Sequence, residues 1–143
     1  MSAAANEAVA RRFNEPFNTG DPAPYDALLA PDWVDHPRAP DQPPGPAGMR
    51  AVVAAFRAAF PDLRVENAAV LVAGDHVTVR TVARGTHRGA FLGLPPTGRR
   101  VEFTAIEIHR ILGGQIAETW HVEDWRTLLA QLGAVLRLAP DQA

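Results

Sequence analysis

Two long predicted strands joined by a pair of glycines constrain the fold of this chain more than any other feature. The stretch spans residues 99–133 and reads RRVEFTAIEIHRILGGQIAETWHVEDWRTLLAQLG. Its pattern predicts strands over 100–111 and 115–123, a tight turn at Gly113-Gly114 and a helix that ends near Gly133. The two strands carry the densest set of proton-handling groups in the chain: Glu107, His109, His121 and Glu123. We expect the preceding residues to enclose one face of this hairpin.

The rest of the chain supplies helices first and then a second hairpin. Val9, Phe13 and Phe17 form one apolar stripe, which predicts an amphipathic helix. The other predicted elements are a short helix over 21–29, an irregular segment or short strand over 31–37, a helix over 46–60, and strands over 63–73 and 77–86. This order is typical of an α+β domain. Strands of about ten residues twist and curl, so we expect three N-terminal helices to cover the concave face of a strongly curved antiparallel sheet, around an apolar pocket.

Length and composition restrict the classes of partner. A chain of 143 residues is the size of one domain, and we expect a single domain over 1–143 with a loose tail from about residue 134. The net charge of -2 gives no electrostatic reason to expect nucleic acid or an anionic membrane surface. The absence of cysteine excludes disulfides and thiolate chemistry. With no signal-like or membrane-spanning apolar run, the cytoplasm is the expected location.

Three segments carry a resemblance to a known family. FNTGD near the start, GTHRGAFLGLPPTGRRV, and IHRILGGQIAETWHVEDWRTLLAQLG are similar to the SnoaL-like polyketide cyclases and ester cyclases of the NTF2-like superfamily. The resemblance covers roughly residues 5–133 and implies a cone-shaped α+β fold and a homodimer formed through the outer face of the sheet. In the cyclases it implies cofactor-free intramolecular aldol closure of a polyketide ring. The same superfold hosts isomerases, epoxide hydrolases and non-catalytic binding proteins.

The resemblance also implies positions for the catalytic pair. In the cyclases an aspartate on the last strand is the acid/base residue, and a histidine on the preceding strand supports it. These positions fall on His121 and Glu107, so the imidazole and the carboxylate have exchanged places, and a glutamine-like pocket position falls on Ala105. We expect His121 to be the general base, because an unperturbed imidazole is largely neutral at pH 7. Glu107 would orient the ring and stabilise the imidazolium. The alternative is that both residues lie on a solvent-exposed hairpin.

Other side chains are candidates for binding a hydrophobic small-molecule substrate, polycyclic substrates included. His109 shares the strand parity of Glu107, and His36 lies in a loop expected to rim the pocket. A flat substrate could lie against aromatic rings. The full set of predicted substrate-binding residues is His109, His36, Phe13, Phe17, Trp33, Phe56, Phe91, Phe103, Ala105 and Thr119. We expect Glu123 to act in the first turn of the last helix, and His76 and His87 to lie at the surface.

No cofactor or metal is expected, because the sequence contains neither an HxH nor an HExxH spacing and no phosphate-binding loop with its lysine. The leading prediction is therefore a cofactor-independent cyclase or related lyase or isomerase acting on a carbonyl compound. A ketosteroid-isomerase-like enzyme is an alternative, although its tyrosine could only be Tyr25. Epoxide hydrolysis by a carboxylate network and non-catalytic binding of a small molecule stay open as further alternatives.

The register of the hairpin decides which side chains share a face. A three-residue turn at 112–114 would place Glu107 opposite Thr119 and Ala105 opposite His121, which makes Glu107 and His121 diagonal neighbours on one face. The same register collects apolar residues on the other face: Ile106, Ile108, Ile116, Trp120 and Val122. We expect a second copy of the chain to cover this apolar face, which gives a two-fold symmetric homodimer.

Overall fold

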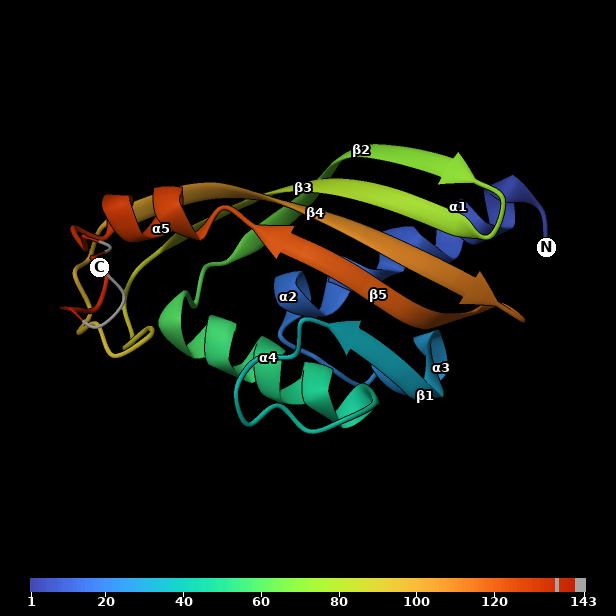
Figure 1. Ribbon diagram of the computed structural model, residues 1–143, viewed down its shortest axis with the longest axis horizontal. Coiled ribbons are helices and arrows are strands. Elements are labelled where there is room, and N and C mark those ends of the chain that lie inside the picture. The colour runs from blue at the N-terminus through green and yellow to red at the C-terminus, as the bar shows by residue number, and fades with distance from the viewer. Residues whose placement is uncertain (136, 141–143) are drawn as a thin grey trace.

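Helices lie against one side of a five-stranded sheet in the computed structural model, which describes residues 1–135 and 137–140 (Figure 1). The elements are α1 (Ala3–Arg11), the 3₁₀ helix η1 (Arg12–Asn14), α2 (Glu15–Thr19), α3 (Tyr25–Leu28), β1 (Leu29–His36), α4 (Pro46–Ala59), β2 (Arg64–Ala73), β3 (His76–Thr86), β4 (Arg100–Leu112), β5 (Gln115–Glu123) and α5 (Trp125–Gln131). The strand order is β1-β5-β4-β3-β2. The predicted α+β class is confirmed. The tail predicted from about residue 134 falls partly on 136 and 141–143, outside the described residues.

The first predicted helix is divided into three short ones. The chain tightens into η1 after α1, and α2 then begins with Pro16 in its first turn. A proline has no amide hydrogen to donate and its ring clashes with a preceding helical turn, so the helix restarts there. Gly20 ends α2 with a left-handed φ of 78°. None of the described helices is long and apolar enough to cross a membrane.

The segment predicted over 31–37 belongs, up to His36, to the edge strand β1, which corrects the predicted antiparallel sheet. β1 pairs in parallel with β5, while the other three strand pairs are antiparallel, so the sheet is mixed. A parallel pair needs a long crossover, which α4 and the β2–β4 strands provide here. The pairing brings Asp35 of β1 beside Thr119 of β5, so β1 adds side chains to the edge of the hairpin.

The predicted register of the β4–β5 hairpin is wrong, although Glu107 and His121 do lie on the same face of the sheet. Leu112 pairs with Gln115, so the turn has two residues, and both Gly113 and Gly114 have positive φ values of 56° and 81°. A bulge then leaves Ala117 unpaired. The extra residue shifts the parity by one position and places Glu107 directly opposite His121 on the inner face.

Buried side chains form two clusters. One gathers around Tyr25 and Trp33, and the other around Phe60 and Leu128. Members of both clusters line a cavity of about 710 Å³ between the inner face of the sheet and the helices. In Figure 1, α4 runs below the long strands, with α2 between α4 and the sheet, and α2 contacts both α4 and β2. The helices therefore enclose the concave face of the sheet and leave room there for a ligand.

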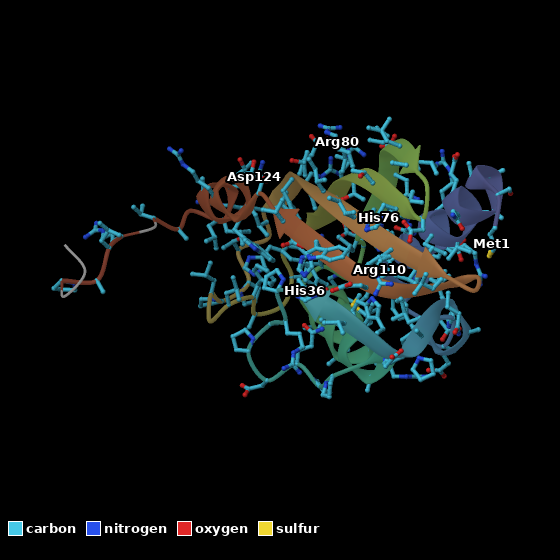
Figure 2. The ribbon with its side chains drawn as sticks, turned by 45° about the vertical axis from the view of Figure 1, so that its right-hand side comes forward. Met1, His36, His76, Arg80, Arg110 and Asp124 are labelled. Carbon is cyan, nitrogen blue, oxygen red and sulfur yellow. The ribbon has the colours of Figure 1, made fainter. Side chains whose placement is uncertain are left out.

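The outer face of the sheet is apolar and exposed along the hairpin. The exposed fractions of Ile106, Ile108, Trp120 and Val122 lie between 36% and 65%. Ile116, which we expected on this face, is fully buried in the core, because the bulge at Ala117 reverses the parity there. The rings of His36 and His76 stack on Trp120, with centroids 5.4 Å and 6.1 Å away. Figure 2 shows the two histidines on this side of the sheet, close to Arg110.

Candidate active site

The cavity is lined by polar groups from η1, β1 and the strands β3–β5, and by a wall of aromatic rings. Eight of the predicted site residues line it: Phe13, Phe17, Phe56, Phe91, Phe103, Ala105, Glu107 and His121. Several further polar or aromatic residues line the cavity that the sequence did not predict there: Asn14, Asp35, Gln42, Thr81 and Trp125, together with Glu123, for which we expected another role. The cavity therefore combines a few ionisable groups with a mostly apolar surface, as small-molecule sites do.

Trp125 organises the aromatic wall. Its ring lies 6.0–6.4 Å from those of Phe56, Phe91 and Phe103, with interplanar angles of only 24–30°. Phe56 and Phe91 are tilted by 54° to one another, so Trp125 is the central flat surface of the wall, against which a flat substrate could lie. Trp125 is the first residue of α5, after the Asp124 cap. The sequence indicated only that it belongs to the hydrophobic face of that helix, not that it lines the cavity.

His121 lies between two carboxylates. Its Nδ1 donates to Glu123 Oε1 over 2.5 Å, and its Nε2 lies 2.9 Å from the carbonyl oxygen of Pro37 and 3.2 Å from Asp35 Oδ1. Burial of the ring lowers the pKa of His121, but the hydrogen bonds to Asp35 and Glu123 outweigh burial and raise that pKa to about 10. The ring is therefore an imidazolium at neutral pH, which contradicts the expected neutral general base.

Gln42, which lies in the loop over 37–45, is hydrogen-bonded to Asp35, one of the two carboxylates beside the His121 imidazolium. Its Nε2 donates to Asp35 Oδ2 over 2.9 Å, and its Oε1 accepts from the amide nitrogen of Ala39 over 2.9 Å. Asp35 is 8% exposed, and both of its oxygens are engaged, Oδ1 by His121 and Oδ2 by Gln42. Asp35 and Trp33 are two residues apart, so they share a face of a strand. The sequence could have placed Asp35 on the inner face only if residues 31–37 had been predicted as a strand, without the irregular segment as an alternative.

Glu107 is a second, separate centre. Its side chain accepts two hydrogen bonds at Oε2, from Asn14 Nδ2 over 3.2 Å and from His109 Nε2 over 3.1 Å. Its Oε1 has no hydrogen-bond partner among the described residues, and the side chain lines the cavity. The expected contact between Glu107 and His121 does not form, because each side chain is held by other groups. Glu107 thus offers the cavity a carboxylate oxygen that is separate from the His121 imidazolium and its partners.

Four predicted site residues do not line the cavity. His109, Thr119 and Trp33 are buried behind it, where the ring of Phe13 lies 4.6 Å from that of His109. His36 is on the outer face, where its Nε2 lies 2.7 Å from Glu118 Oε2, because alternation along β1 points it away from Asp35.

His87, expected at the surface, is fully buried. Its ring lies 5.6 Å from that of Phe60, and its Nδ1 accepts from the amide nitrogen of Thr97 over 3.2 Å. The turn residues around His87 suggested exposure, but the loop over 88–98 folds back over the ring.

These two centres can carry out proton transfer at a carbon acid. A free carboxylate oxygen can accept a proton, and a fixed positive charge in an apolar cavity stabilises the oxyanion that results. Within residues 1–135 and 137–140, no group of three or more His, Asp or Glu side chains is arranged to hold a metal ion.

Comparisons with known proteins found similar sequences and structures. A sequence model of the family described as SnoaL-like polyketide cyclase matches residues 7–132. Nogalonic acid methyl ester cyclase of Streptomyces nogalater is 31% identical over 120 residues, which are 82% of this chain and 89% of that protein. The structure of TsrD from Streptomyces laurentii has a TM-score of 0.86 and 31% identity, covering 94% of this chain and 99% of that one. Wild-type IdmH from Streptomyces antibioticus has a TM-score of 0.76 and 38% identity, covering 91% and 99%.

Proposed function

This chain belongs to the SnoaL-like polyketide cyclase family, and on that premise we propose that it is a cofactor-independent enzyme that closes a ring in a carbonyl compound by intramolecular aldol-type addition. The observation that carries the proposal is the Glu107 carboxylate, which is held at one oxygen and available to the cavity at the other. The aromatic wall around Trp125 supports an apolar, flat substrate.

In this reaction Glu107 and His121 exchange the roles expected from the sequence. Glu107 Oε1 removes a proton from a methylene flanked by two carbonyls, which is acidic enough to need no further activation. The enolate carbon then forms a carbon–carbon bond with a carbonyl carbon of the same molecule, and the resulting alkoxide takes up the proton that Glu107 removed, which returns Glu107 to its carboxylate form. His121, with its pKa raised to about 10, supplies the positive charge that stabilises the oxyanions. Atoms and electrons balance without an external oxidant or reductant.

The proposal is tested by mass spectrometry on open-chain aromatic polyketide esters, beginning with nogalonic acid methyl ester, after which the Streptomyces nogalater relative is named. We expect a product of unchanged mass and altered retention time, or one lighter by a single water when the aldol dehydrates. Tight binding without conversion of any of these esters would instead support a non-catalytic binding protein.

One observation favours a second reaction, the hydrolysis of an epoxide. Asp35 and Glu123 flank His121, so a carboxylate that activates water lies close to a group that can donate a proton to the opening ring. Hydrolysis adds one water to the substrate. The same mass measurement on an epoxide-bearing analogue therefore separates this reaction from ring closure.

The ketosteroid-isomerase-like alternative loses its support at Tyr25. The hydroxyl of Tyr25 donates to the carbonyl oxygen of Phe13 over 2.8 Å, and the side chain is fully buried outside the cavity lining. Burial, and then the charges of Glu107 and Asp35, raise the pKa of Tyr25 well above its ordinary value. The hydroxyl is therefore not placed to hold a substrate oxyanion.

We further propose that two copies of the chain pack through the apolar outer face of the sheet. Val122 is 65% exposed there, so Val122→Glu should leave the fold intact but place a charge in the interface. Light scattering at micromolar concentration should report a dimer for the wild type and a monomer for Val122→Glu. Leu138→Glu, at a 75% exposed position in the tail, is the matched control and should stay dimeric. A monomeric wild type contradicts the proposal.

A further inference from the structure

Behind Glu107, a continuous chain of hydrogen bonds crosses the buried interior of the sheet. Trp33 Nε1 donates to Thr119 Oγ1 over 3.0 Å, Thr119 Oγ1 lies 2.9 Å from His109 Nδ1, and His109 Nε2 lies 3.1 Å from Glu107 Oε2. Trp33, Thr119 and His109 are 3%, 1% and 0% exposed. None of the three lines the cavity, so the chain contacts a substrate only through Glu107.

The donor at the far end gives this chain a direction. An indole N–H can only donate, so Thr119 Oγ1 accepts from Trp33. Thr119 Oγ1 has no other hydrogen-bond partner among the described residues, so the acceptor left for its hydroxyl proton is the lone pair on His109 Nδ1. A neutral imidazole that accepts at Nδ1 carries its hydrogen on Nε2, the nitrogen that faces Glu107 Oε2. Trp33 and Thr119 therefore select the tautomer of His109.

A second donor fixes the same carboxylate oxygen from the other side. Asn14 Nδ2 donates both to Glu107 Oε2 and to Asn67 Oδ1, over 3.2 Å and 3.1 Å. Asn67 is itself anchored, because its Nδ2 donates to the carbonyl oxygen of Arg11 over 2.9 Å. Two donors thus converge on Oε2, and Oε1 is left without a hydrogen-bond partner among the described residues.

We propose that His109 is a positioning residue, kept neutral and in its Nε2–H tautomer by Thr119 and Trp33, which makes Glu107 present a single unpaired oxygen to the substrate. A second proton on Nδ1 would turn His109 into a cation paired with Glu107 and weaken the carboxylate as a base. That proton would also leave the buried hydroxyl hydrogen of Thr119 without an acceptor among the described residues. This inference rests on the proposed role of Glu107 in proton abstraction.

Two-bond ¹H–¹⁵N correlation spectra of the chain labelled with ¹⁵N-histidine test the proton positions without any substrate. We expect His109, assigned by its loss in His109→Gln, to show an unprotonated Nδ1 and a protonated Nε2 at neutral pH. His121, with its pKa of about 10, should show two protonated nitrogens in the same spectrum and serves as an internal reference. A doubly protonated His109, or the Nδ1–H tautomer, would overturn the proposal.

Thr119 variants test the consequence for turnover. Thr119→Val removes the hydroxyl, and Thr119→Ser keeps it as the matched control. We expect Thr119→Val to lower kcat roughly tenfold, part of the about 10²–10⁴-fold that a positioned acid/base group contributes, with KM nearly unchanged. Thr119→Ser should keep kcat at the wild-type value. Thr119→Val alone leaves the buried N–H of Trp33 without its acceptor, so the double variant Trp33→Phe with Thr119→Val removes that N–H as well. We expect the double variant to have the same kcat as Thr119→Val.

The outcomes separate the two proposals. Wild-type kcat in Thr119→Val, or equal losses in the valine and serine variants, would overturn the positioning role even when Glu107 is essential. Full turnover in Glu107→Gln would instead overturn the proposed function, while the tautomer seen in the spectra of the wild type would stand on its own.

Discussion

Replacing Glu107 with glutamine should lower kcat by about 10²- to 10⁴-fold, the usual contribution of a positioned general base. Glutamine keeps the shape of the side chain, and its amide oxygen can still accept from Asn14 and His109. It cannot take up a proton from a carbon acid. Because substrate contacts are preserved, KM should change little, and the loss should appear in kcat measured at saturating substrate.

Glu102→Gln is the matched control for this prediction. Glu102 lies on the same strand, but it is exposed on the outer side and pairs with Arg84 over 2.9 Å. Its substitution should leave kcat at the wild-type value. If Glu107→Gln retains wild-type turnover while its thermal stability is unchanged, Glu107 is not the base.

Replacing His121 with glutamine should reduce the free energy of unfolding by an amount that depends strongly on pH. The folded pKa of His121 is about 10, against an ordinary value of 6.5. Proton binding to the folded state therefore stabilises it fully below about pH 6.5, and this contribution is lost as pH rises through about 10. The difference between wild type and variant should be on the order of a few kcal/mol near pH 6.5 and should shrink toward pH 10.

Urea denaturation across this pH range measures the effect, and Glu123→Gln tests its cause. That variant keeps the imidazole but removes one of its two carboxylate partners, which leaves Asp35 as the only negative charge in contact with the ring. The loss of stability should then begin at lower pH than in the wild type. A difference between wild type and His121→Gln that is equal at pH 6.5 and pH 10 would show that His121 does not bind its proton more tightly in the folded state.

Local pattern predicted the hairpin and the face on which its polar groups lie. Side chains along a strand alternate with a period of two, so the residues that share a face within each strand could be grouped from the sequence. That Glu107 and His121 share a face was predicted from a register that proved wrong. The exact register was not predicted. The turn is one residue shorter than expected, and the bulge at Ala117 adds one unpaired residue, so the two differences together leave Glu107 and His121 on the same face. A bulge is selected by the twist and neighbours of the finished sheet, and these are not visible in a single strand.

The motifs also determined the family and the mostly apolar, aromatic character of the pocket, because both depend on residue types rather than on exact contacts. Only the tertiary structure decided the charge on His121. Its partner Asp35 comes from β1, which lies far away in sequence and reaches β5 through a parallel pairing. Likewise, Asn14 and His109 decide which oxygen of Glu107 is free. The protonation of a side chain depends on the charges and donors within a few ångströms of it, and folding brings these together from distant parts of the chain.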